Sequence, residues 1–257
     1  MLPTPDTSHV PYERVYEPAE DSFLLLDTFS SESEKTWLRE HFRPDTNAPP
    51  PLVLEIGTGS GVVIGFVNAH ADTLFGTRRV LTAGVDMNAY ACRATVGTAK
   101  RAIEDNPTTH GMYLGSSMGD LASCFRPHAV DVLIFNPPYV PTPDMPVKPD
   151  QFLAEVPEKD AEDPSFDDDS YLLALSYAGG HDGMETTDRL ISQIPDILSE
   201  RGCAYLLLCA QNKPQEVKQK IAQLEGGWRT EMVGSSGKTA GWEKLQVLRI
   251  WRDKSGA

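Results

Sequence analysis

The order of apolar and polar positions along the chain predicts an alternation of strands and helices. Short apolar runs typical of buried strands occur at 52–57 ("LVLEIG"), 80–86 ("VLTAGVD"), 111–115 ("GMYLG"), 130–135 ("VDVLIF") and 203–210 ("CAYLLLCA"). Patterns typical of amphipathic helices occupy 18–29, 33–42, 59–70, 88–106, 184–200 and 214–225. Strands that alternate with helices in this way form a mostly parallel sheet with helices on both faces.

Two details of these helices can be predicted as well. The apolar face expected of the first helix consists of Phe23, Leu24, Leu26 and Phe29. Gly202 lies two residues after the end of the helix at 184–200, at the position where a glycine commonly ends a helix in the left-handed conformation.

The end of the chain carries two strand patterns, 228–236 and 243–252, with too few residues between them for a helix. A parallel neighbour would need a long crossover connection, so this last pair must run antiparallel. The sequence therefore predicts an α/β fold, an open sheet with one reversed strand near its C-terminal end.

The chain divides into a short arm, one domain and a tail. Residues 1–14 are polar and proline-rich and are expected to form a flexible arm, followed by a single domain at 15–252 and a tail at 253–257. Within the domain, 140–169 is expected to be an irregular loop. The strongly acidic stretch at 154–170 favours a solvated loop, with a substrate lid as the alternative.

Composition narrows the class of protein. The chain has 257 residues, 40% of them apolar, a formal net charge of -14 and a pI near 4.8. This charge disfavours nucleic acid as a partner bound through its phosphates. No leader or membrane-spanning pattern is visible, so we expect a cytoplasmic protein, with the nucleus kept open as a second location. The four cysteines and six histidines lack ligand spacing, and we expect no metal site.

A glycine-rich turn, "LVLEIGTGSG", follows the first predicted strand. Its GxGxG spacing lets a ligand approach the backbone closely, and it differs from the GxGxxG of dinucleotide folds. Glu55 would repel a pyrophosphate at the following helix N-terminus but would tolerate a cationic ligand. The candidate cofactor-binding residues of this turn are Glu55, Gly57, Thr58 and Gly59.

Acidic residues follow the next two strands. Asp86 ends the second strand, where a carboxylate can accept the hydroxyls of a ribose, and Met87 beside it could support a purine. After the third strand, Asp120 could accept the adenine amino group, with Leu121 against the ring. Three signals at one sheet edge favour S-adenosylmethionine as the cofactor, with an NAD-type cofactor as the alternative.

The fourth strand ends in Asn136, Pro137, Pro138 and Tyr139. Two acceptors, the Asn136 side-chain oxygen and the Pro137 carbonyl, could hold both N–H groups of a planar amine, whose conjugated lone pair is a poor nucleophile. Proline stiffens the turn, and Tyr139 could stack on the planar group. Asn136, Pro137 and Tyr139 are therefore the candidate catalytic residues, and Pro138 joins them as a candidate substrate-binding residue.

The motifs "EIGTGSG", "GVDMN" and "NPPY", with "VYEPAEDSFLLLD" and "AGGHDGMETTDRLI", resemble the HemK-like glutamine-N5 methyltransferases. The resemblance is to the eukaryotic and archaeal branch that acts on the class 1 translation release factor, and it covers residues 12–251. It implies a class I methyltransferase fold with a seven-stranded sheet. It also implies S-adenosylmethionine as cofactor, S-adenosylhomocysteine as product, and Ser22 and Asn136 among the cofactor-binding residues.

The same resemblance implies a partner and a substrate. The partner is a small zinc-binding activator subunit that forms a heterodimer by adding a strand near Met112–Leu114. The implied substrate is the release factor, and the implied reaction is N5-methylation of the glutamine in its Gly-Gly-Gln loop. The alternatives kept open are N6-adenine methylation of DNA or RNA, protein-lysine methylation, and a cofactor-binding scaffold without catalysis.

Overall fold

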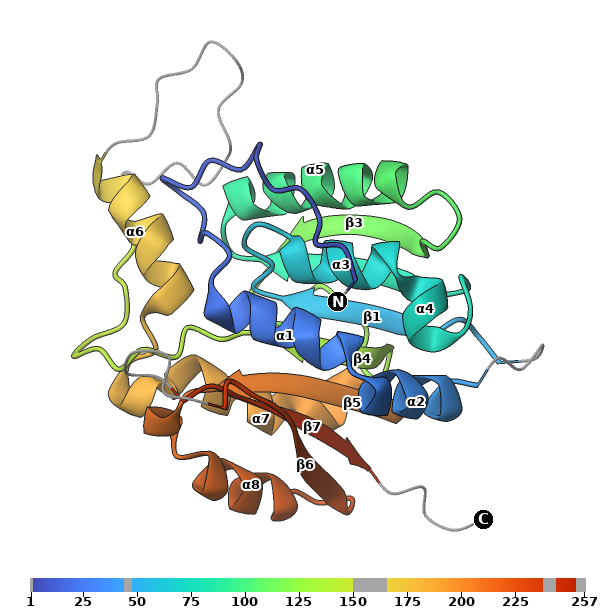
Figure 1. Cartoon of the computed structure of the whole chain (residues 1–257). Helices are drawn as coiled ribbons and strands as arrows, with labels where there is room; N and C mark the ends of the chain where they lie inside the picture. Colours follow the sequence, from blue (N-terminus) through green and yellow to red (C-terminus); the bar gives the residue numbers. More distant parts are fainter. Residues whose placement is uncertain (1, 44–47, 150–165, 238–243, 253–257) are drawn as a thin grey trace.

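A single seven-stranded sheet forms the centre of the computed structural model, which describes residues 2–43, 48–149, 166–237 and 244–252 (Figure 1). The strands are β1 Leu52–Ile56, β2 Leu81–Asp86, β3 Met112–Met118, β4 Val130–Phe135, β5 Leu198–Leu208, β6 Trp228–Ser235 and β7 Gln246–Arg252. Their order is β3-β2-β1-β4-β5-β7-β6; β7 runs antiparallel to both β5 and β6, and all other neighbouring strands are parallel. The expected sheet with one reversed strand near the C-terminus is confirmed.

Helices cover both faces of the sheet. They are α1 Glu20–Ser30, α2 Glu32–His41, α3 Val62–Ala69, α4 Ala71–Phe75, α5 Ala89–Asp105, α6 Phe166–Tyr177, α7 Glu185–Ile197 and α8 Pro214–Ala222, with short 3-10 turns η1 His181–Gly183 and η2 Ala210–Asn212. Helices α1 to α5 lie on one side and α7 and α8 on the other, whereas α6 lies beyond the carboxyl ends of the parallel strands (Figure 1).

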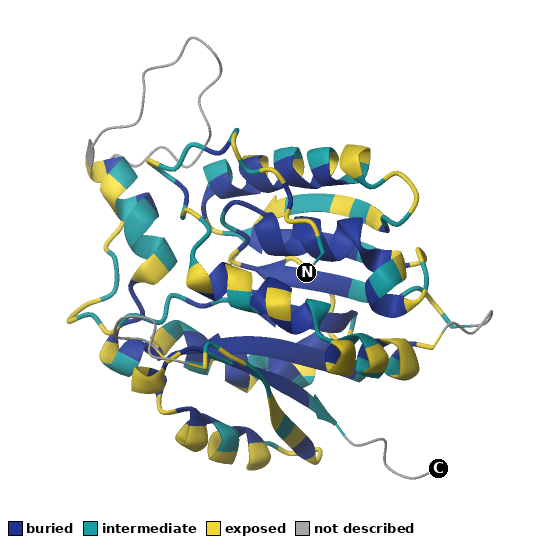
Figure 2. Ribbon diagram, viewed as in Figure 1, coloured by how far each residue is buried: buried dark blue, intermediate teal, exposed yellow. Residues whose placement is uncertain are grey.

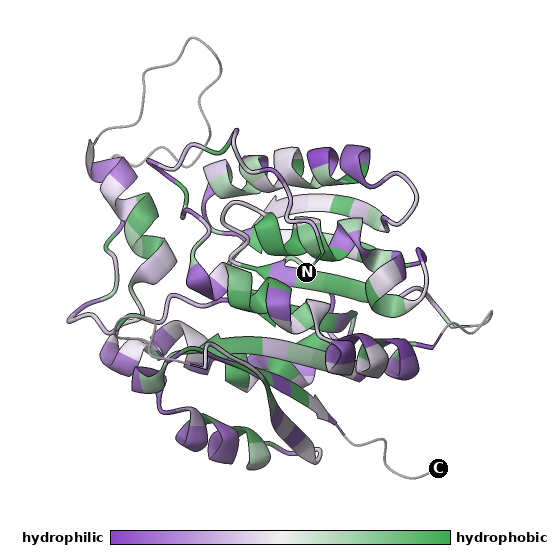
Figure 3. Ribbon diagram, in the orientation of Figure 1, coloured by the Kyte–Doolittle hydropathy of each residue, from purple (hydrophilic) through white to green (hydrophobic). Residues whose placement is uncertain are grey.

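Two apolar layers, one on each face, hold the sheet between the helices. Val53 of β1 packs with the layer that contains α1 and α3, and its neighbour Leu54 packs with the layer that contains α7 and α8. Every residue of β4 is buried. The central strands are buried in Figure 2 and largely hydrophobic in Figure 3, as expected for parallel strands covered on both faces.

The buried face of α1 differs from the one expected. Phe23 is 44% exposed, whereas Leu25 is fully buried together with Leu26 and Phe29. The buried positions, which include Ser22, follow the spacing i, i+3, i+4 and i+7 of a single helix face. Phe23 lies outside that face, so assigning it to the core was wrong.

The expected helix end at Gly202 was also wrong. Helix α7 ends at Ile197, and Leu198 already has extended backbone dihedrals. Leu198 pairs with Val130, and the register shifts before Cys203 pairs with Val132. Gly202 therefore lies inside β5. A strand that begins immediately after a helix leaves no loop residues to reveal the boundary.

The segment at 140–169, expected to be irregular, ends in a helix. Helix α6 begins at Phe166 and carries three acidic residues in its first turn, which favours a helix N-terminus. Residues 150–165, with most of the acidic stretch at 154–170, lie outside the described residues. The structure also adds the short helix α4, and β3 extends to Met118, beyond the expected end at 115.

Residues 2–14 contain no helix or strand but contact the domain. Val10 is buried, and His9 Nε2 lies 3.1 Å from the Ala94 carbonyl oxygen on α5. Arg14 donates from Nε to Asp169 Oδ1 of α6 at 2.7 Å. The arm thus joins α5 to α6, and the flexibility expected from its composition stays a prediction. The expected tail, 253–257, lies outside the described residues.

Candidate active site

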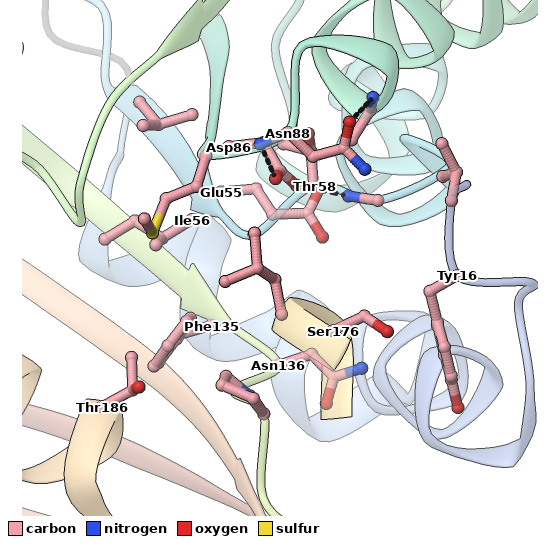
Figure 4. Close-up of a pocket in the computed structure, with 18 of the residues that line it drawn as sticks. Tyr16, Glu55, Ile56, Thr58, Asp86, Asn88, Phe135, Asn136, Ser176 and Thr186 are labelled. Carbon is pink, nitrogen blue, oxygen red and sulfur yellow. Dashed lines mark hydrogen bonds between the residues drawn. The ribbon is translucent and has the colours of Figure 1, made fainter. Parts of the chain in front are cut away.

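A cavity of about 260 Å³ lies at the carboxyl ends of β1, β2 and β4. The residues expected at the site that do line it are Ser22, Glu55, Gly57, Thr58, Gly59, Asp86, Met87, Asp120, Leu121, Asn136 and Pro138. Pro137 and Tyr139 do not line it. Figure 4 shows Asp86, Asn88 and Thr58 on one side of this cavity and Asn136, Ser176 and Tyr16 on the other.

The glycine turn forms one wall with backbone atoms. Gly57, Gly59 and Gly61 all have positive φ, at 67°, 50° and 77°. Only glycine adopts this conformation without a steric penalty from Cβ. The turn is closed by hydrogen bonds from Gly57 N to the Val85 carbonyl and from Gly61 N to the Thr58 carbonyl, both at 2.7 Å. A ligand can therefore approach the main chain directly.

Glu55 lies beneath this turn and is 2% exposed. Its Oε2 accepts a hydrogen bond from the backbone N–H of Ile64 in the first turn of α3, at 2.9 Å. Burial raises the pKa of Glu55 well above its usual range, and the nearby charge of Asp86 raises it further. A cationic ligand in the cavity would favour the ionised carboxylate.

Asp86 is placed at the tip of β2 as expected. Its Oδ2 accepts from Gly59 N at 3.0 Å and its Oδ1 from Asn88 N at 2.8 Å. Burial raises the pKa of Asp86, against the effect of these two hydrogen bonds. Each oxygen keeps a second lone pair, so the carboxylate can also accept from two neighbouring hydroxyls of a ligand.

Asp120 and Leu121 lie on the same rim of the cavity. Leu121 is buried and has a φ of 51°. Asp120 forms an ion pair with Arg189 of α7, which also lines the cavity. Sequence reasoning missed Arg189, because nothing in its local pattern indicates that α7 reaches this rim.

Asn136 directly follows the last residue of β4. The nitrogen of its side-chain carboxamide is hydrogen-bonded to another described residue, whereas the oxygen is not. Nδ2 donates to Asp21 Oδ2 at 3.0 Å. Oδ1 is buried and has no hydrogen-bond partner among the residues that the structure describes. A carboxylate can only accept, so the nitrogen must be the atom that faces Asp21, and the oxygen is the free atom. A buried, unpaired acceptor is costly unless a ligand supplies a donor.

Asp21 itself is 3% exposed and lies in the first turn of α1. Its Oδ2 also accepts from the hydroxyl groups of Tyr16 at 3.2 Å and Tyr139 at 3.4 Å. The hydroxyl of Tyr139 thus faces Asp21, and Pro137 is buried outside the cavity lining. Asp21 belongs to the motif "VYEPAEDSFLLLD", which also contains Ser22, but the sequence analysis did not single it out.

The loop "YAGGHDG" supports the turn that follows Asn136. Gly179 N donates to the Val140 carbonyl at 2.8 Å. The Asn212 side chain donates from Nδ2 to the carbonyl oxygens of Tyr139 at 3.0 Å and Asp182 at 3.1 Å. Ala178, at the start of the loop, lines the cavity. The loop therefore borders the site and holds the Asn-Pro-Pro-Tyr turn from behind.

Helix α6 closes the cavity with side chains that the sequence did not single out. They are Tyr171, Leu172, Leu175 and Ser176. The apolar spacing of "YLLAL" is the signal that could have identified this helix. Among the described residues, no group of histidines, cysteines and acids could hold a metal ion, and no helix has the length and apolar character to cross a membrane.

Curated proteins similar to this chain are methyltransferases. The chain is 32% identical to the eRF1 methyltransferase catalytic subunit mtq2 of Schizosaccharomyces pombe, over 98% of this chain and 96% of that protein. It is 31% identical to methyltransferase HEMK2 of Homo sapiens, over 96% and 95%. A putative protein N5-glutamine methyltransferase of Methanocaldococcus jannaschii is 29% identical over 94% and 93%.

Similar solved structures are more distant. They include a magnesium protoporphyrin IX methyltransferase of Synechocystis with bound SAH, 15% identical over 94% of this chain and 93% of that chain, at a TM-score of 0.44. A ribosomal protein L11 methylase of Lactobacillus delbrueckii is 10% identical over 91% and 80%, at a TM-score of 0.45. No protein-family model matches the chain.

Proposed function

The chain belongs to the methyltransferase family of HEMK2 and the eRF1 methyltransferase catalytic subunit mtq2, and we propose that it methylates the side-chain amide nitrogen of a glutamine in a peptide-chain release factor. The family expected from the sequence is thereby confirmed, and the chain is an S-adenosylmethionine-dependent methyltransferase. The substrate amide nitrogen would gain the methyl group and lose one proton to solvent, while the bond between that methyl carbon and the cofactor sulfur would break and leave its electron pair on the sulfur. The products are N5-methylglutamine and S-adenosylhomocysteine.

The observation that carries this proposal is the buried Oδ1 of Asn136, which has no hydrogen-bond partner among the described residues. A carboxamide nitrogen is planar, and its lone pair is delocalised, so it needs orientation more than it needs a strong base. Asn136 Oδ1 can accept a hydrogen bond from one of the two N–H groups of the substrate amide and so hold the substrate nitrogen at the cavity. Prearranged groups of this kind contribute about 3 kcal/mol to a transition state, by analogy with oxyanion-hole donors.

Two further substrate contacts remain part of the proposal. The Pro137 carbonyl would accept the second N–H of the amide, and Tyr139 would contact the planar group. Neither residue lines the cavity, and the Tyr139 hydroxyl is directed to Asp21. Pro138 does line it, so of the three residues that follow Asn136 it is the one best placed to contact the substrate.

The charge of the cofactor site suits its ligand. When bound, S-adenosylmethionine supplies a methyl group on a positively charged sulfur. The buried Glu55 and the partly buried Asp86 contribute two acidic side chains to this cavity, which disfavours an anionic pyrophosphate. We propose that Asp86 binds the ribose hydroxyls, that Met87 and Leu121 contact the purine, and that Asp120 accepts from its amino group.

The exposed edge of the sheet supports a partner subunit. Strand β3 is an edge strand, and Met112, Leu114 and Met118 are 61%, 54% and 49% exposed on it. Figure 2 shows this strand largely exposed, in contrast to the buried centre. Exposed apolar edges invite pairing with another chain. We therefore propose that a small zinc-binding activator adds a strand here to form a heterodimer. The cytoplasm, where translation terminates, is the proposed location.

The experiment is site-specific mass spectrometry of the methylated product. The chain, co-expressed with its activator, is incubated with labelled S-adenosylmethionine and a release factor, with duplex DNA and a lysine-rich protein as competing substrates. We expect one methyl group on the glutamine of the Gly-Gly-Gln loop. Label found only on adenine or lysine would overturn the proposal.

The matched variants are Asn136→Ala and Asn106→Ala. Asn136→Ala should lower turnover by about 100-fold or more with S-adenosylhomocysteine binding largely kept. Asn106 caps the far end of α5, outside the cavity lining, so its variant should retain full turnover.

A further inference from the structure

We infer that Asp21 is a positioning residue for methyl transfer, which acts by holding the Asn136 carboxamide with its oxygen free for the substrate amide. The inference rests on the proposed function and identifies a residue that works through Asn136. Asp21 does not line the cavity, so it does not contact the substrate itself.

The geometry fixes the direction of the carboxamide. Asn136 Nδ2 and Asp21 Oδ2 are 3.0 Å apart, and Asp21 is almost fully buried. Rotation of the carboxamide by 180° would bring Asn136 Oδ1 against the Asp21 carboxylate, which has no proton to donate. Two acceptors in contact inside the protein are strongly unfavourable, so only the orientation with a free oxygen is stable.

The carboxylate is itself held in place by several donors. Besides Asn136, its Oδ2 accepts from the hydroxyls of Tyr16 and Tyr139, and its Oδ1 accepts from Ser22 N at 2.6 Å. The donors come from the N-terminal segment, from α1 and from the turn after β4. Asp21 therefore fixes the position of α1 relative to the catalytic turn.

The negative charge also affects the strength of the free acceptor. An amide whose N–H donates to a carboxylate carries more negative charge on its oxygen, because successive hydrogen bonds polarise one another. Asn136 Oδ1 then binds the substrate N–H more strongly. This effect increases as the attacking nitrogen becomes positive, so it stabilises the transition state more than the bound substrate.

A simpler role for Asp21 would be to stabilise the N-terminus of α1. Glu20 is in the same first turn and is exposed, so it can supply that interaction without touching Asn136. Glu20→Gln is therefore the matched control for Asp21→Asn. In the latter, the new NH2 group faces either the donors on Oδ2 or the Ser22 N–H, so the hydrogen-bond network cannot be fully satisfied.

The test compares kcat, KM and S-adenosylhomocysteine binding in the heterodimer. Asp21→Asn should lower kcat by about tenfold or more, while KM for the cofactor and the Kd for S-adenosylhomocysteine change less than about threefold. Glu20→Gln should match the wild type. A wild-type kcat in Asp21→Asn, or a parallel loss of kcat and cofactor binding, would overturn the inference.

If the Asp21→Asn variant does not fold, a second measurement on the wild type tests the inference. In the wild type, the Asn136 side-chain amide protons, assigned by their loss in Asn136→Ala, should exchange slowly and resonate downfield. Fast exchange at a random-coil shift would contradict the inference. If the wild type does not methylate glutamine at all, the proposed function fails first. If it does so while Asp21→Asn is fully active, only the role of Asp21 fails.

Discussion

At Gly61 the backbone turns with φ at +77°, where the loop after β1 enters α3. A Cβ there would lie 2.6 Å from Thr95 Cα, so both the dihedral angle and the available space require glycine. Gly227 has a similar φ of +71°, but nothing lies within 4 Å of its Cβ position. Comparing substitutions at Gly61 and Gly227 therefore separates the cost of backbone strain from the cost of steric overlap.

We predict that Gly227→Ala lowers the free energy of unfolding by about 1 kcal/mol. Gly61→Ala should lower it by about 3 kcal/mol or more and also weaken S-adenosylhomocysteine binding, because the turn must move. Denaturant unfolding and calorimetric titration measure both quantities. Equal losses in the two variants would contradict the role assigned to Thr95.

Glu55 makes stability depend on pH. Burial raises the pKa of Glu55 well above its usual value of 4.5. Above pH 4.5 the unfolded chain loses this proton while the folded chain retains it, so the free energy of unfolding falls as pH rises toward the raised pKa.

Glu55→Gln should therefore flatten this fall and melt at a higher temperature than the wild type at neutral pH, without cofactor. The raised pKa of Asp86 has the same effect on stability in the wild type and in Glu55→Gln. The difference between their curves of stability against pH therefore comes from Glu55. The exposed Glu104 provides the control Glu104→Gln, which should leave the curve unchanged. A pH dependence in Glu55→Gln identical to the wild type would refute the assignment.

The sequence could predict those site residues that lie at the carboxyl end of a strand or directly after it. Glu55, Asp86 and Asn136 each lie at the end of an apolar run, and parallel strands bring their carboxyl ends to one edge. Asp21 and Arg189 reach the same site from helices far away in the chain. No local pattern encodes such a distance, so only the folded structure identifies these two residues.

Among the elements, α2 is tied to the sheet by a buried ion pair. Arg249 of β7 donates from Nη1 to Glu34 Oε1 and Oε2 at 2.7 and 2.8 Å, and Tyr205 of β5 donates to the same carboxylate at 2.8 Å. Both charged side chains are at most 5% exposed. Removing Arg249 leaves the buried Glu34 carboxylate with the Tyr205 hydroxyl as a donor but without the opposite charge of Arg249.

We predict that Arg249→Met lowers the free energy of unfolding by about 3–5 kcal/mol, and that adding Glu34→Leu recovers part of this loss. Lys220 and Asp188, which pair at 2.8 Å between α8 and α7, are both about half exposed. Lys220→Met should therefore change stability little. Additive losses in the Arg249 and Glu34 variants would show that the pair is not coupled.

Element boundaries were less predictable than element types. The sequence placed the end of α7 near Gly202 because glycine commonly ends helices, but β5 begins at Leu198. The polar residues 199–202 ("SERG") resemble a helix end followed by a turn, although they already belong to β5. Helix α6 was missed because an acidic, proline-containing segment precedes it.

At the scale of the whole molecule, the sheet has two edges of different character. Strand β3 exposes Met112, Leu114 and Met118, whereas β6 at the opposite edge exposes Met232, at 48%. The fold class was predictable because alternating strands and helices restrict the topology. Which edge accepts a partner depends on side-chain exposure, which a sequence pattern does not give.

We predict that Leu114→Lys abolishes co-purification of the activator, because a charged side chain disfavours strand addition at that edge. Met232→Lys is the matched change on the other edge and should leave the complex intact. Size-exclusion chromatography of the co-expressed proteins measures the outcome. Loss of the complex only in Met232→Lys would move the interface to β6.

The central claim is that the free oxygen of Asn136 receives an N–H of the substrate glutamine. The most direct test is a crystal structure of the heterodimer with S-adenosylhomocysteine and a peptide that contains Gly-Gly-Gln. We predict that Asn136 Oδ1 lies within about 3.2 Å of the glutamine amide nitrogen while Nδ2 stays on Asp21. A glutamine bound elsewhere, or Asn136 turned with its nitrogen toward the peptide, would contradict the account.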